Sequence, residues 1–96
     1  MKKLTKEQRN NVYKRALDLF TEKFYFRDTS KYLCDNIMFA VISLGYDESF
    51  SYTQVEQYFP EFMAKKPKRP YGTEWWQGKN RKIRIKVLKQ CIKETE

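Results

Sequence analysis

The segment 31–44, KYLCDNIMFAVISL, constrains the fold of this chain more than any other, because apolar residues fill most of it. On a helix these residues recur three and four positions apart and cover most of the circumference. A helix of this kind normally lies at the centre of a domain, with neighbours on several sides. Gly45 follows directly, at the position where a helix end favours a left-handed residue. We therefore predict a central helix over 31–44, around which the other segments pack.

Capping residues and helical spacing predict three further helices before the last segment. A Thr-x-x-Gln capping box at positions 5–8 begins a helix over 6–24, and a Ser-x-x-Gln box at 51–54 begins a helix over 52–58. Pro60 suits the first turn of a helix over 60–65. The basic loop that follows, 65–74, contains two prolines and a glycine, which interrupt regular structure.

The last segment, RKIRIKVLKQCIK, has two interpretations. Ile83, Ile85 and Val87 alternate with charged residues, as in a strand. A helix over 81–93 sorts the residues better, because the lysines then share one stripe and the apolar side chains occupy the opposite surface. We predict the helix. The whole chain of 96 residues is then one all-α domain, 1–96, of four to five helices.

The net charge of +8 is confined to the last third of the chain. Residues 1–64 carry nine basic and nine acidic residues, whereas 65–96 carry eleven basic and three acidic residues. Such a surface favours a polyanionic partner, although a solvated face that aids solubility has the same composition. The candidate polyanion-binding residues are Lys65, Lys66, Lys68, Arg69, Lys79, Lys82, Lys86, Lys89 and Lys93.

Arg81 and Arg84 fall within the apolar surface of the last predicted helix, where a cation needs a partner. One solution is a structural pair with Asp35 or Glu74. The other is a pocket in which both guanidinium groups and the helix N-terminus hold a phosphate, with aromatic rings stacked on a base. The candidate ligand-binding residues are Arg81, Arg84, Trp75, Trp76, Tyr71, Asn36 and Asp35.

Nothing in the sequence indicates catalysis or a cofactor. Histidine is absent, and Cys34 and Cys91 alone do not make a zinc site of known spacing. We expect both cysteines to be reduced. Residues 1–11 lack the apolar run of a signal peptide, and no segment has the roughly 20 apolar residues that span a membrane. We therefore expect a cytoplasmic protein that is not an enzyme and has no membrane partner.

The order of LCDNI, FPEF, a Lys-Pro loop, YGTEWW and R-x-x-R-x-x-x-L, over roughly 33–88, resembles small uncharacterised proteins encoded by tailed bacteriophages. The residues that match are Cys34, Asn36, Phe59, Pro60, Glu61, Trp75, Trp76, Arg81 and Leu88. The resemblance implies a short helical protein in the cytoplasm of a host bacterium. Such proteins often counter host defence by capturing nucleotide signals or by blocking a nuclease.

Our first functional hypothesis is therefore capture of a phosphate-bearing nucleotide, because two arginines among apolar residues favour a defined anionic group. The alternatives are nucleic-acid binding by the C-terminal basic face and inhibition of a host defence protein through its acidic surface. A homo-oligomer is compatible with each of these functions.

Overall fold

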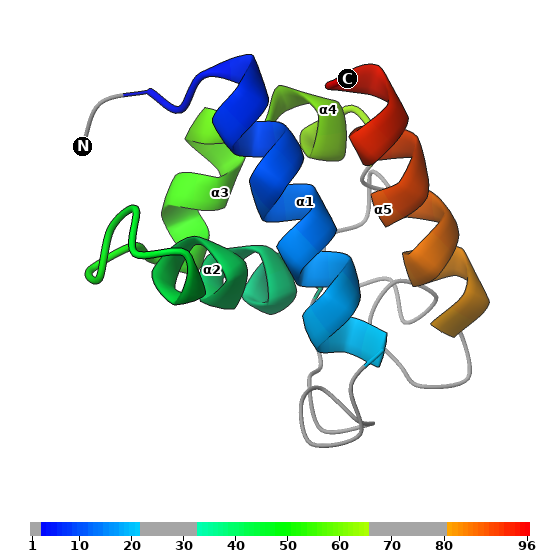
Figure 1. Ribbon diagram of the computed structural model, residues 1–96, viewed down its shortest axis with the longest axis horizontal. Helices are drawn as coiled ribbons and strands as arrows, with labels where there is room; N and C mark the ends of the chain where they lie inside the picture. Colours follow the sequence, from blue (N-terminus) through cyan, green and yellow to red (C-terminus); the bar gives the residue numbers. More distant parts are fainter. Residues whose placement is uncertain (1–2, 22–32, 66–80) are drawn as a thin grey trace.

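The computed structural model describes residues 3–21, 33–65 and 81–96, and within these ranges it contains five helices and no strand (Figure 1). The helices are α1 (Lys6–Thr21), α2 (Leu33–Ser43), α3 (Tyr52–Tyr58), α4 (Pro60–Met63) and α5 (Arg81–Glu94). The prediction of an all-α domain is confirmed. The interpretation of the last segment as a strand is wrong, because residues 81–94 form one continuous helix.

The predicted helix bounds differ from the observed ones by a few residues. The predicted helices over 6–24, 31–44, 52–58, 60–65 and 81–93 correspond to observed helices over 6–21, 33–43, 52–58, 60–63 and 81–94. The helix predicted over 60–65 is shorter because Lys65 donates its N–H to the carbonyl of Phe62, three residues back, which closes the helix with a tight turn. The predicted basic loop 65–74 lies outside the described residues except for Lys65.

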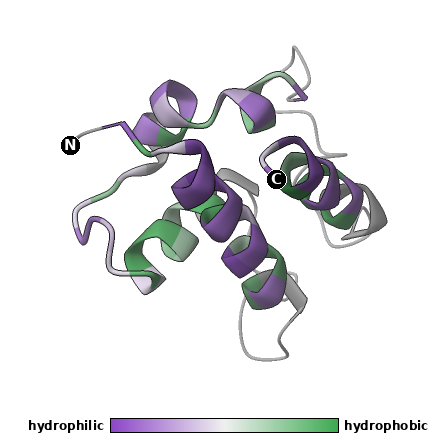
Figure 2. Ribbon diagram, turned by 45° about the horizontal axis from the view of Figure 1, so that its top comes forward, coloured by the Kyte–Doolittle hydropathy of each residue, from purple (hydrophilic) through white to green (hydrophobic). Residues whose placement is uncertain are grey.

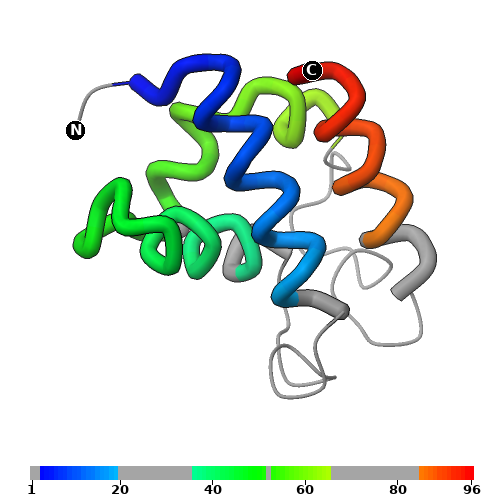
Figure 3. The backbone as a smooth tube through the Cα atoms, viewed as in Figure 1, coloured from blue at the N-terminus to red at the C-terminus, as the bar shows by residue number. Residues whose placement is uncertain are grey.

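Helix α1, and not α2, lies between the other described helices. It packs against α2 on one side and α5 on the other, while α3 contacts α2 and α4 contacts both α3 and α5 (Figures 1 and 3). The prediction that 31–44 is the centre is therefore wrong for the described part of the chain. Helix α1 has 16 residues against 11 in α2, and its buried residues cover two adjoining faces. Phe39 on α2, in contrast, is 45% exposed.

All five helices supply side chains to one apolar core. Its buried members are Leu4, Val12, Tyr13, Ala16, Leu19, Ile37, Ala40, Val41, Phe50, Val55, Phe59, Phe62, Val87, Leu88 and Cys91. Figure 2 shows α2 as the most evenly apolar helix, whereas α1 and α5 alternate between apolar and polar residues. The ring of Phe59 packs against two other aromatic rings of this core. It contacts Tyr13 edge-on at 5.5 Å and Phe50 edge-on at 6.0 Å between ring centroids.

The predicted helix signals are present where expected. The Thr5 N–H donates to the Gln8 side chain at 2.9 Å, and the Gln8 N–H donates to the Thr5 hydroxyl at 3.1 Å. At the second box the Ser51 N–H donates to Gln54 at 2.9 Å. Gly45 has φ +74°, the left-handed conformation predicted for it, and the chain turns away from α2 there. These contacts satisfy backbone groups that a helix end leaves without partners.

Asn10 links α1 to the C-terminal end of α5 by hydrogen bonds. Its side-chain amide donates to the carbonyl of Ile92 at 2.9 Å and to the hydroxyl of Thr95 at 3.1 Å. That hydroxyl in turn donates to the carbonyl of Cys91 at 2.7 Å. Because Asn10 lies near the start of α1 and its partners lie at the end of α5, the two helices run antiparallel (Figure 3).

Within the described ranges, no helix has the length and apolar character that would let it cross a membrane.

Candidate functional site

The side of α5 that faces away from the core carries lysines. The exposed residues of this helix include Lys86, Lys89, Gln90 and Lys93, and its buried residues are Val87, Leu88 and Cys91. The exposed set follows the i, i+3, i+4, i+7 spacing of a single helix face, and the buried residues occupy the opposite one. We call Lys86, Lys89 and Lys93 the lysine face. The predicted separation of lysines from apolar residues on this helix is confirmed for these described side chains.

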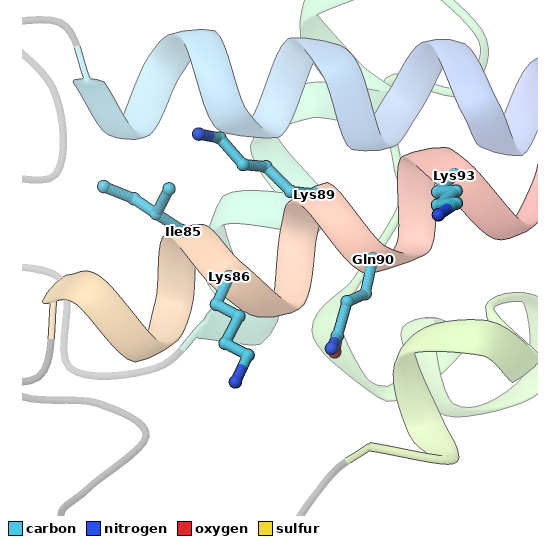
Figure 4. Close-up of a pocket in the computed structure, with 5 residues that line it drawn as sticks. All are labelled: Ile85, Lys86, Lys89, Gln90 and Lys93. Carbon is cyan, nitrogen blue, oxygen red and sulfur yellow. The ribbon is translucent and has the colours of Figure 1, made fainter.

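An open hollow of about 460 Å³ lies on the lysine face, and the other described residues that line it are Ile85 and Gln90 (Figure 4). In Figure 4, Ile85 and Lys89 extend toward α1, whereas Lys86 and Gln90 extend to the opposite side of α5. Lys93 lies farther along α5 than the other four residues and points toward the viewer. By helical spacing, the three lysines lie between Ile85 and Gln90 around the axis of α5, so one apolar and one amide side chain flank the lysine positions.

The lysine face has no acidic partner among the described residues. Glu94, the acidic residue that follows the lysines on α5, is bonded to the Lys65 ammonium at 2.7 Å. The same ammonium donates to the backbone carbonyl of Glu61 at 3.1 Å. The ammonium group of Lys65 therefore joins the end of α4 to α5. The binding of a polyanion by Lys65 stays a prediction.

Asn36 is the predicted ligand-binding residue whose side chain the structure describes. It is fully buried on α2, and neither its amide nitrogen nor its amide oxygen has a hydrogen-bond partner in the described part of the chain. An unpaired buried amide costs about 1–3 kcal/mol. The role of Asn36 in a ligand pocket stays a prediction.

The remaining predicted site residues cannot be placed relative to the hollow. The backbones of Arg81, Lys82 and Arg84 on α5 and of Asp35 on α2 are described, but their side chains lie outside the described part. Tyr71, Trp75, Trp76, Lys66, Lys68, Arg69, Lys79 and Glu74 lie outside the described residues altogether. The pairing of the arginines with Asp35 or Glu74, and their alternative role in a phosphate pocket, both stay predictions.

The structure contains a polar network that the sequence analysis missed. The Arg9 guanidinium donates from Nε to Oε1 of Glu61 at 3.0 Å and from Nη2 to Oε2 at 3.1 Å. The Tyr13 hydroxyl donates to Oε1 of Glu61 at 2.9 Å and accepts the N–H of Phe62 at 3.3 Å. The sequence gives little sign of this network, because its partners are about 50 positions apart and no local motif links them.

The electrostatics of this network are those of a structural contact. Burial disfavours ionisation of Glu61, but hydrogen bonds from Arg9 and Tyr13 outweigh it and hold the pKa of the carboxyl below its usual value. Burial raises the pKa of the Tyr13 hydroxyl far above its usual range, so this group stays a neutral donor. Both carboxylate oxygens are occupied by partners that fix α1 against α4.

Cys91 is a buried free thiol beneath the lysine face. Burial raises its pKa to about 12, so the thiolate, which is the reactive form, is disfavoured at neutral pH. As a member of the buried core, Cys91 acts as a small hydrophobic residue. The described residues contain no group of three or more Cys, Asp or Glu side chains arranged to hold a metal ion.

A comparison of this chain with known protein families, with curated proteins and with solved structures found no match. The resemblance to phage-encoded proteins, the cytoplasmic location and the homo-oligomer therefore stay predictions.

Proposed function

We propose that this protein binds nucleic acid through the lysine face, with the lysine ammonium groups on the phosphate backbone. One observation carries the proposal: three exposed lysines, none paired in the described part of the chain, surround an open hollow on one face of α5. Lysine contacts to phosphates supply most of the affinity of sequence-independent binding, because they release counterions condensed on the nucleic acid.

The arrangement of the lysines costs stability, which supports a role beyond solubility. Lys89 follows Lys86 by three positions and precedes Lys93 by four, so each neighbouring pair is close on the helix surface. Like charges at these spacings destabilise a helix by roughly 0.2–0.5 kcal/mol per pair. The first turn of α5 has no acidic residue to offset the positive end of the helix dipole. A bound polyanion relieves both of these repulsions.

The length of the lysine face favours a strand over a single phosphate. Lys86 and Lys93 are seven positions apart, which corresponds to roughly 10 Å along a helix axis. A row of this length matches successive phosphates of a chain better than one compact anionic group. Nucleotide capture, our first hypothesis from the sequence, depends on Arg81 and Arg84, whose side chains lie outside the described part. It stays a prediction, as does inhibition of an acidic host protein.

The proposal describes a binding protein and not an enzyme. It is supported by the state of Glu61, the acidic residue with the most extensive contacts in the described part. Both of its oxygens accept hydrogen bonds from Arg9 or Tyr13, so neither is available to accept a proton from a substrate without loss of the α1–α4 contact.

The test is fluorescence anisotropy with a labelled 20-nucleotide single strand, measured over a range of salt concentrations. The lysine-face variant carries Lys86→Gln, Lys89→Gln and Lys93→Gln. The matched control carries Lys3→Gln, Lys6→Gln and Lys14→Gln, which remove the same charge from exposed positions in and before α1. We expect the slope of log K against log salt to become about two units shallower in the lysine-face variant, because each phosphate contact contributes roughly 0.7.

Three outcomes would contradict the proposal. The first is a wild-type protein that does not bind the strand. The second is an equal loss of affinity in both triple variants, which would mean attraction by net charge alone. The third is full retention of affinity by the lysine-face variant. Mononucleotides and cyclic nucleotides, added as competitors in the same assay, test the nucleotide hypothesis separately.

A further inference from the structure

We infer that Gln90 contacts the bases of the bound nucleic acid and gives the site a preference for adenine. This inference rests on the proposed function and concerns the same hollow. The lysines account for phosphate binding, but the lining also includes an uncharged polar side chain that a simple polyanion site does not need. Phosphate contacts position a protein on nucleic acid, whereas contacts to base edges read the sequence.

The positions of the side chains assign phosphate binding and base recognition to different residues of the hollow. By helical spacing, the lysine positions lie between Ile85 and Gln90 around α5. Gln90 lies on the side of α5 away from α1 (Figure 4). A strand whose phosphates lie along the lysines has its bases to one side of that line. On the side of Gln90 the bases meet an exposed amide, whereas on the other side they meet Ile85, which is half-buried and cannot form hydrogen bonds.

The amide of glutamine has a donor and an acceptor at the spacing of the N6 and N7 atoms of adenine. A two-bond contact of this kind distinguishes adenine from the other bases. Gln90 is exposed on α5 and has no hydrogen-bond partner in the described part of the chain, so both groups are available to a ligand. The same adenine edge is open in a single strand and in the major groove of a duplex, so the chemistry applies to both.

The test compares affinities for different bases within each protein variant. The ligands are the single strands dA12, dT12 and dC12, and 12-base-pair duplexes of A·T or G·C composition. The variants are Gln90→Ala, Gln90→Arg and the matched control Gln57→Ala, which removes an exposed glutamine from α3. Binding is measured by anisotropy at one salt concentration, with the salt slope as a second readout.

We expect the wild type and Gln57→Ala to favour dA12 over dC12 by roughly five- to tenfold, and Gln90→Ala to lose this preference. The salt slope of Gln90→Ala stays unchanged, because no phosphate contact is lost. Gln90→Arg shifts the preference of the duplexes from A·T to G·C, since arginine pairs with two acceptors on guanine. A preference seen only in the single strands, or only in the duplexes, identifies which form the site accepts.

The inference and the proposed function fail in different ways. If the wild type binds none of the ligands, the proposed function is wrong. If it binds them, and the lysine-face variant weakens binding while Gln90→Ala keeps the same base ratios as the wild type, the assignment of Gln90 is wrong and the lysine face stands. A uniform loss of affinity in Gln90→Ala, with unchanged ratios, also overturns the assignment.

Discussion

Arg9 on α1 and Glu61 on α4 are 52 positions apart in the chain and form a two-pronged ion pair. Their side chains are 19% and 16% exposed, so the contact is largely shielded from solvent. Because Tyr13 donates to the same carboxylate, one acidic residue holds two side chains of α1. Together with the bond from the Phe62 N–H to the Tyr13 hydroxyl, these contacts fix α4 against α1.

Replacement of Glu61 by alanine should lower the free energy of unfolding by about 2 kcal/mol, because it leaves the Arg9 guanidinium and the Tyr13 hydroxyl without their partner. Urea denaturation followed by circular dichroism measures this difference. The control is Glu48→Ala at an exposed position, for which we expect a change within about 0.5 kcal/mol. Equal effects of the two substitutions would show that the network does not contribute to stability.

The same carboxyl should make stability depend on pH in the acid range. The pKa of the Glu61 carboxyl is lower in the folded protein than its ordinary value of 4.5. Its contribution to stability is therefore complete above about pH 4.5 and is lost as the pH falls through the folded pKa. Glu61→Gln lacks this titration. The gap in unfolding free energy between wild type and Glu61→Gln should therefore narrow below pH 4.5, when denaturation is measured between pH 7 and pH 3. A difference in unfolding free energy that stays constant over this pH range would contradict the assignment of the pH dependence to the Glu61 carboxyl.

Asn10 and Asn36 offer a matched pair for the effect of hydrogen bonding in the core. Both are buried, but Asn10 bonds to Ile92 and Thr95, whereas Asn36 has no partner in the described part of the chain. We expect Asn10→Ala to lower the free energy of unfolding by about 1–3 kcal/mol, and Asn36→Ala to leave it unchanged or to raise it. Thermal and urea denaturation measure both. An equal loss in Asn36→Ala would show that this amide has a partner.

Repulsion among the charges of the lysine face should destabilise the folded protein, although the same charges favour the binding of nucleic acid. Substitution of Lys89 by glutamine removes repulsion with both Lys86 and Lys93, so we expect an increase of about 0.5 kcal/mol in unfolding free energy at low salt. High salt should abolish this increase, because screening already weakens the repulsion in the wild type. Lys14→Gln on α1 is the control. A destabilised Lys89→Gln protein would indicate that the ammonium group makes a favourable contact within the fold.

Local patterns in the sequence were sufficient to predict the helices. The capping glutamines at positions 8 and 54 and the glycine at 45 act within one turn of the residues they affect, so their signals are visible without a structure. The split of α5 into a lysine face and a buried face also follows from spacing along one helix. The candidate surface could therefore be predicted, including the positions of Lys86, Lys89 and Lys93.

Contacts between distant segments could not be predicted in this way. Arg9, Glu61 and Lys65 have ordinary sequence surroundings, and only the packing of α1, α4 and α5 decides that they are partners. The same limit explains the error over the central helix. The apolar character of α2 measures how much of it avoids water, but the number of neighbours depends on where the other helices pack.

The bond between Asn10 and the end of α5 also affects the order in which the fold can form during synthesis. Ile92, whose carbonyl accepts the bond from the Asn10 side chain, is synthesised about 80 residues after Asn10, and the rest of α5 is made at about the same time. Until residue 95 has been made, the side of α1 that packs against α5 lacks its α5 contacts. The apolar side of α1 that faces α5 therefore stays without this partner until α5 has been made, and the α1–α5 contact, which joins segments far apart in the sequence, forms later than the contacts within each helix.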